Sequence, residues 1–155
     1  MRGIFAWLCV AGAIVAAACA GEALAQATAA DPYDTLAADR AVYQKVCSAC
    51  HSLEKPDAKT ADAAGWGAIV DRMKGNGAAV DAAAREKILG WLAAKSTFDV
   101  KCSACHGTDR PLGKSKSRAD WAATVQRMGA KKPGHLSDAE AATISAYLSL
   151  VRPAP

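Results

Sequence analysis

The pentapeptide Cys-Ser-Ala-Cys-His occurs twice in the chain, at residues 47–51 and again at residues 102–106. C-x-x-C-H is the attachment signature of c-type haem, because both thiolates add to the vinyl groups of the porphyrin and the adjacent imidazole binds the iron. One helical turn carries all three side chains to one face of one ring. The repeated motif therefore predicts two covalently bound haem c groups in one chain.

The two motifs assign a role to each reactive residue. The thioether positions are Cys47, Cys50, Cys102 and Cys105, and the proximal iron ligands are His51 and His106. The other two cysteines lie in the N-terminal leader, so none remains for a disulfide framework. Zinc binding and thiol redox chemistry are the alternatives. Zinc pairs usually lie roughly 15–20 residues apart and a thioredoxin-like motif needs a βαβ context, and the sequence shows neither.

The first 25 residues are typical of a secretory signal peptide. Arg2 precedes an apolar core over residues 4–20, and residues 23–25 form an A-x-A cleavage site. A transmembrane anchor and lipid attachment at Cys19 are less favoured alternatives. Since c-type haem is attached outside the bacterial cytoplasm, we expect a periplasmic protein, cleaved near Ala25, with no membrane span in the mature chain.

The mature chain contains an internal repeat. A forward shift of 55 residues takes Tyr43 to Phe98, Trp66 to Trp121 and Met73 to Met128, as it takes the first motif to the second. One inserted residue near positions 133–135 then places Leu92 on Leu148. The simplest interpretation is two tandem haem domains, over residues 26–95 and 96–155.

Each copy shows the spacing of three helices. Apolar residues in the first copy follow the i, i+3, i+4, i+7 rule most clearly from Trp66 to Met73. The predicted helices of the first copy cover residues 36–46 and 66–73 and a third segment that starts after Asp81 and includes residues 84–92. Those marked in the second copy cover residues 121–128 and 137–151. The polar stretches 52–61 and 107–118 are predicted loops. No segment sustains period-two alternation, so the predicted class is all-α.

These features resemble the class I cytochrome c fold. In that family an aromatic residue one turn before the first Cys, here Tyr43 or Phe98, packs against the C-terminal helix. A proline carbonyl after the motif, which would be that of Pro56 or Pro111, commonly accepts the Nδ1–H of the proximal histidine. The W-x-x-x-V-x-R-M pattern is also similar to haem-binding domains of dihaem subunits in periplasmic dehydrogenases, including quinohaemoprotein amine dehydrogenase. The resemblance implies tandem cytochrome c-like domains.

The sixth iron ligand is predicted to be a methionine. Beyond the initiator, the chain has only Met73 and Met128, which occupy equivalent positions in the two copies. A methionine on an apolar helix face most often fills the core. The pairing of both methionines with both motifs instead favours ligation, by Met73 at the first haem and Met128 at the second. His135 is the competitor in the second domain, where the first has Ala79.

The net charge of +4 lies in the second copy, because residues 26–95 balance nine basic against nine acidic side chains, whereas residues 96–155 have nine against five. The propionates of two haems would lower this charge, which argues against nucleic-acid binding. The excess predicts a basic face for a redox protein with an acidic docking surface, the alternative being a solvated surface. Its candidate residues are Lys101, Arg110, Lys114, Lys116, Arg118, Lys131 and Lys132.

Two irons with filled coordination would pass single electrons without binding a substrate. We therefore expect a periplasmic dihaem electron carrier, or the cytochrome subunit of a dehydrogenase, that is not itself an enzyme. The alternatives are a dihaem peroxidase and a haem-based sensor, each of which needs an open iron site. The sequence supplies no obvious distal acid/base pair for the peroxidase.

Overall fold

The structure, a computed structural model, describes residues 30–155, so the predicted signal peptide and its cleavage site lie outside the described residues. Its helices are α1 (Pro32–Cys47), α2 (Glu54–Asp57), α3 (Ala63–Gly75), α4 (Ala82–Ser103), α5 (Asp109–Leu112), α6 (Arg118–Ala130) and α7 (Asp138–Val151). Within these residues there is no strand, and the predicted all-α class is confirmed. No helix in residues 30–155 is long and apolar enough to cross a membrane.

The longer helices begin at side-chain caps that can be recognised from the sequence. The Asp62 carboxylate accepts a hydrogen bond from the backbone N–H of Gly65 at 2.7 Å, and Asp81 caps α4 in the same way. At the start of α7, Ser137 and Glu140 form a reciprocal capping box. Each such cap contributes about 1 kcal/mol by satisfying backbone N–H groups that the first helical turn leaves free.

The structure differs from the predicted helices in two ways: α2 and α5 lie in predicted loops, and α4 is longer than predicted. The predicted loops 52–61 and 107–118 each contain a helix of one turn, which is too short to show a periodic pattern. The predicted helix over residues 84–92 continues without a break to Ser103, so α4 also carries Cys102. The predicted domain boundary between residues 95 and 96 therefore falls inside α4.

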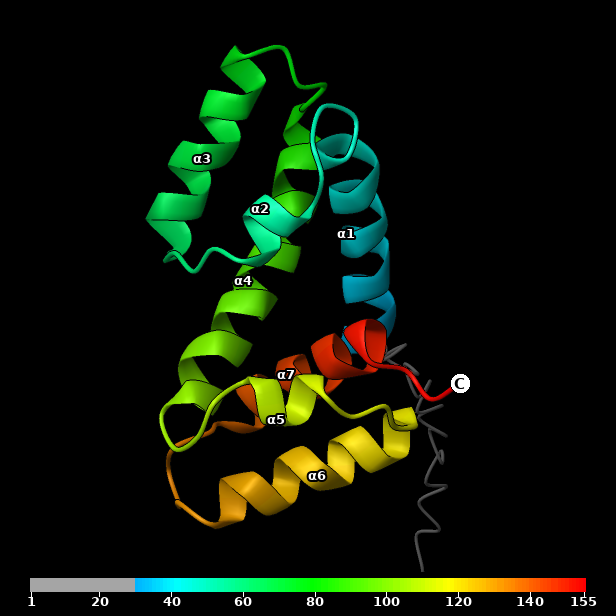
Figure 1. Cartoon of the computed structure of the whole chain (residues 1–155), viewed down its shortest axis with the longest axis vertical. Helices are drawn as coiled ribbons and strands as arrows, with labels where there is room; N and C mark the ends of the chain where they lie inside the picture. Colours follow the sequence, from blue (N-terminus) through cyan, green and yellow to red (C-terminus); the bar gives the residue numbers. More distant parts are fainter. Residues whose placement is uncertain (1–29) are drawn as a thin grey trace, which may run out of the picture.

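The helices pack around one continuous core (Figure 1). Helices α1 and α4 lie side by side, and α7 packs against both of them, while α3 covers α4 and α6 covers α7. Where α1, α4 and α7 meet, the buried rings of Tyr43, Trp91, Tyr147 and Phe98 form an aromatic row with successive centroid separations of 6.0, 5.1 and 5.2 Å. Such pairs contribute about 0.5–1.5 kcal/mol each beyond the burial of their surface. The two sequence copies consequently share their hydrophobic interior.

Polar contacts add to this packing between distant parts of the chain. The Arg40 guanidinium donates to the carbonyl of Leu150 at 2.7 Å and lies 5.5 Å from the centroid of the Trp91 ring. At the N-terminus of α1, Arg118 forms an ion pair with the capping residue Asp31. These contacts tie α1 to the C-terminal end of α7 and to the start of α6.

Candidate functional site

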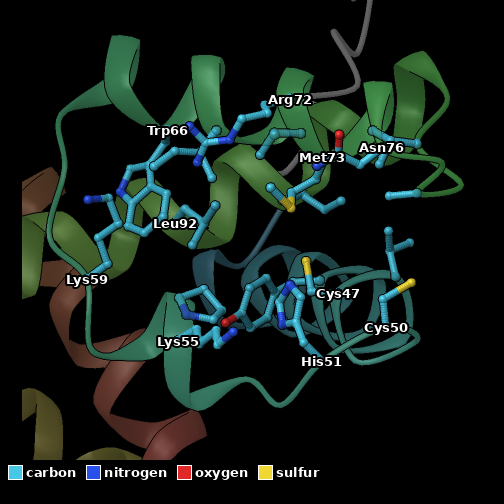
Figure 2. Close-up of a pocket in the computed structure, with 18 residues that line it drawn as sticks. Cys47, Cys50, His51, Lys55, Lys59, Trp66, Arg72, Met73, Asn76 and Leu92 are labelled. Atoms are coloured by element: carbon cyan, nitrogen blue, oxygen red, sulfur yellow. The ribbon is translucent and has the colours of Figure 1, made fainter.

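A cavity of about 340 Å³ opens between α1, α3 and α4. It brings together all four residues predicted for the first haem, namely Cys47, Cys50, His51 and Met73 (Figure 2). Most of the remaining wall is apolar, formed by Tyr43, Val46, Pro56, Trp66, Ile69, Val70, Ala78, Val80, Ile88 and Leu92. An apolar hollow with a few polar groups directed into it is the usual form of a cofactor site.

The reactive side chains come from opposite walls. Cys47 is the last residue of α1, and Cys50 and His51 follow in the turn after it. Met73 lies near the C-terminal end of α3. Figure 2 shows Cys47 and His51 on one side of the cavity and Met73 on the other. A flat ring placed between them would meet an imidazole on one face and a thioether on the other.

The hydrogen bond of His51 leaves its other ring nitrogen for a metal. Nδ1 lies 2.9 Å from the carbonyl oxygen of Ser52. Because a carbonyl only accepts, Nδ1 carries the proton and Nε2 keeps its lone pair. The same arrangement recurs at His106, whose Nδ1 lies 3.0 Å from the carbonyl oxygen of Gly107. In both motifs the acceptor is thus the carbonyl of the next residue, not that of the proline expected from the resemblance.

Cys47 and Cys102 do not have the properties of catalytic thiols. Cys47, Cys50, Cys102 and Cys105 are all free thiols. Burial, followed by the negative charge of Asp57, raises the pKa of Cys47. Burial also raises the pKa of Cys102 to about 11, with the charges of Asp99 and Cys105 adding to the effect. Thiol redox chemistry normally depends on a lowered pKa, so these environments do not favour it.

Hydrogen bonds behind the wall hold the cavity in shape. Trp66, almost fully buried, donates its indole N–H to Ser96 Oγ at 2.8 Å, and Ser96 in turn donates to the carbonyl of Ala61 at 2.9 Å. Tyr43 donates its hydroxyl to Asp57 Oδ1 at 2.7 Å. Burial and this bond raise the pKa of Tyr43 well above its usual range, so the phenol stays neutral. Hydrogen bonds within the protein therefore hold the cavity walls in place without a bound cofactor.

The second predicted set of site residues occupies the corresponding places at the ends of α4 and α6. Cys102 lies in α4, Cys105 and His106 follow the end of that helix, and Met128 lies near the C-terminal end of α6 with 36% of its surface exposed. His135, the competing ligand, has Nε2 2.9 Å from the carbonyl oxygen of Lys101. The choice between Met128 and His135 stays a prediction.

The predicted basic face is only partly available for docking. The Lys101 ammonium donates to the carbonyl of His135 at 3.0 Å and forms an ion pair with Glu140 at 2.9 Å. Lys116 donates to Thr124 Oγ1 at 2.7 Å and lies over the Trp121 ring, and Arg118 pairs with Asp31. Five members are exposed, of which Arg118 is paired with Asp31, while Arg110, Lys114, Lys131 and Lys132 take part in no ion pair within residues 30–155. Any acidic partner would therefore meet mainly these four side chains.

The cavity also contains residues that sequence reasoning missed. Lys55, Lys59 and Arg72 line it together with the motif residues. The two lysines lie in a predicted loop, where no periodicity marks a buried or functional position. For Arg72, the one signal in the sequence of a place at the site is that it directly precedes the predicted ligand Met73.

The residues around this cavity fit a haem, since they combine thiols, an imidazole with a free Nε2, an opposing thioether and an apolar wall. In residues 30–155, no three His, Cys, Asp or Glu side chains gather as they would around a single metal ion. A haem iron needs no such cluster, because the porphyrin supplies four of its ligands. Comparison with known proteins finds no matching family model, no similar curated protein and no similar solved structure.

Proposed function

We propose that this chain is a periplasmic dihaem c-type cytochrome, built from two tandem cytochrome c-like domains, that passes single electrons between redox partners. The observation that carries the proposal is the cavity in which Cys47, Cys50, His51 and Met73 come together. Cys47 and Cys50 would hold the haem through thioether bonds, His51 would bind the iron through Nε2, and Met73 would bind it from the opposite face. When bound, the haem supplies a one-electron Fe(III)/Fe(II) couple.

The chain's own contribution is to hold these groups and to exclude water. The Ser52 carbonyl orients the imidazole, and Trp66, Ile88 and Leu92 form an apolar wall that limits solvent access. Burial and hydrogen bonds around a haem are two of the means by which a protein sets its potential. A methionine opposite a histidine raises that potential relative to a second histidine.

Corresponding contacts in the two sequence copies support the second haem and the duplication. The indole of Trp66 donates to Ser96, and the indole of Trp121 donates at 2.8 Å to the carbonyl of Arg152, which is the residue equivalent to Ser96 once the insertion is counted. The aromatic row is likewise symmetric in sequence, because Tyr43 and Trp91 correspond to Phe98 and Tyr147.

The first test is the cofactor content. The intact mass of the secreted protein, measured under denaturing conditions, should exceed that of residues 26–155 by two haems. The Cys50→Ser and Cys105→Ser variants serve as a matched pair. Each removes the second thiol of one motif and leaves the other motif intact. A mass equal to that of the bare polypeptide would refute the cytochrome proposal.

The second test separates an electron carrier from an enzyme or a sensor. Replacing Met73 with Leu keeps the volume and removes the thioether, so the long-wavelength Met–Fe(III) absorption band should fall by about half and carbon monoxide should bind to that haem. Ile69, another apolar residue of the cavity wall, is the control: Ile69→Leu should leave both properties unchanged. Carbon monoxide binding by the unaltered reduced protein would favour the open-iron alternatives.

A further inference from the structure

Three cationic side chains line the cavity at the first motif. Lys55, Lys59 and Arg72 are the only charged side chains among the lining residues, and none of those that the structure describes is acidic. Within residues 30–155, none of the three takes part in an ion pair at 4.0 Å or less. Three cations without counter-charges beside an apolar hollow favour a ligand that combines an apolar body with negative charges.

The cations lie away from the second cysteine of the motif. Figure 2 shows Lys55 and Lys59 at one end of the cavity and Cys50 at the other, with Arg72 on the α3 side near Trp66 and Met73. A haem attached through its vinyl groups to Cys47 and Cys50 would direct the opposite edge of its ring, which bears both propionates, away from these thiols.

The same three positions are basic in the second copy. The shift of 55 residues that superimposes the motifs takes Lys55 to Arg110, Lys59 to Lys114 and Arg72 to Arg127. Two lysines that do not line the cavity do not repeat in this way, since Lys74 corresponds to Gly129 and Lys45 to Val100. Basic charge recurs at the three positions that line the cavity and not at these two.

We infer that Lys55, Lys59 and Arg72 bind the propionates of the first haem and set its potential, and that Arg110, Lys114 and Arg127 do the same at the second. The inference rests on the proposed function. It also changes the interpretation of the basic C-terminal half, because Arg110 and Lys114 become part of a haem site and are no longer docking residues for the partner.

The backbone of Lys59 is held in place from behind. Lys95 is buried, with only 4% of its surface exposed. Its ammonium donates to the carbonyl of Lys59 at 2.8 Å and to Asp99 Oδ2 at 2.6 Å. Thr60 also donates to Asp99 Oδ2, at 3.2 Å. The segment that presents Lys59 is therefore anchored to α4, so its side chain starts from a fixed point.

A cation at the haem edge stabilises the reduced state, because reduction adds one negative charge to the site. It also lowers the pKa of a propionate that it faces, since it favours the ionised form. Removing two of the three cations should therefore lower the potential of the first haem and move any propionate-linked pH dependence of that potential to higher pH.

The test uses the mature holoprotein and the Lys55→Met/Lys59→Met variant, with Lys74→Met as a control for loss of an exposed charge. Potentials are measured by optical redox titration from pH 5 to 9, after intact mass has shown two haems in each preparation. We expect the reduced-to-oxidised ratio of one haem to fall about tenfold at fixed ambient potential, which is 59 mV for a one-electron couple. The control should change that ratio less than twofold, and Lys55→Arg/Lys59→Arg should restore it.

Each outcome decides the inference. An equal shift in the double variant and in Lys74→Met, or no shift in either, overturns it while leaving the two-haem proposal standing. If Lys55→Met/Lys59→Met loads no haem but Lys55→Arg/Lys59→Arg does, the result supports a requirement for positive charge. If neither variant loads haem, the inference is overturned. Absence of haem from the unaltered protein refutes the proposed function, and the inference with it.

Discussion

Replacing Trp91 with Phe should cost less stability than the same replacement at Trp121. Both tryptophans are buried, with exposed fractions of 3% and 1%, so the two substitutions remove a similar amount of apolar contact. They differ in the indole N–H. Trp121 Nε1 donates to the carbonyl of Arg152 at 2.8 Å, whereas Trp91 Nε1 has no hydrogen-bond partner within residues 30–155.

The magnitude of the difference follows from this contrast. At Trp121, the substitution removes the indole hydrogen bond to the carbonyl of Arg152, which still accepts from the backbone N–H of Lys116 at 3.3 Å. The loss is therefore that of one hydrogen bond, about 0.5–1.5 kcal/mol. At Trp91, it removes a buried polar group that already lacks a partner. Phe retains a ring face for the Arg40 guanidinium, so much of the cation–π contact is preserved. We therefore expect the Trp91→Phe variant to be more stable than the Trp121→Phe variant by about 0.5–1.5 kcal/mol.

The assay is guanidinium unfolding of the holoprotein, followed by far-ultraviolet circular dichroism and haem absorbance together. Trp91→Ala is the control for the importance of the position, because complete removal of a buried tryptophan ring should cost about 3–5 kcal/mol. If Trp91→Phe is as destabilising as Trp121→Phe while Trp91→Ala behaves as expected, then the unpartnered N–H is not a source of instability and the reasoning fails.

Three further predictions concern a cap, a titrating carboxyl and the docking surface. Ser137→Ala removes the capping box of α7 and should lower the free energy of unfolding by about 1 kcal/mol, and an unchanged thermal midpoint would contradict this. Burial raises the pKa of Asp39, so ionisation of this carboxyl destabilises the folded state as the pH rises above the ordinary pKa of 3.8. Asp39→Asn should therefore be more stable than the parent at pH 7 and lose that advantage in acid, as measured by unfolding from pH 3 to 7. Reversing the charges of Lys131 and Lys132 should slow electron transfer to an acidic partner more than charge reversal at Lys45. Salt should reduce this difference, because the Debye length falls to about 3 Å at 1 M. An electron-transfer rate indifferent to salt would place docking elsewhere.

Local chemistry is what the sequence by itself determined. Cys47, Cys50 and His51 lie within five consecutive residues, so a haem attachment site can be proposed there without knowing how the chain folds. The capping box of α7 is similarly local, since its two side chains bond to backbone groups within one turn. The all-α class also follows from spacing within single helices. Each of these features depends on neighbours a few residues apart.

Only the tertiary structure decided how distant segments meet. The sequence indicated a break between the two copies, but α4 continues through it, because residues on both sides, such as Trp91 and Phe98, are buried against Tyr147 in one core. Lys55 and Lys59 lie in a segment without periodicity, and their place at the cavity depends on contacts such as that between Lys95 and the Lys59 carbonyl, 36 residues apart. Such contacts form only when the helices pack, because the entropy lost in closing a long loop is offset by burial of the whole core and not by any single pair of residues.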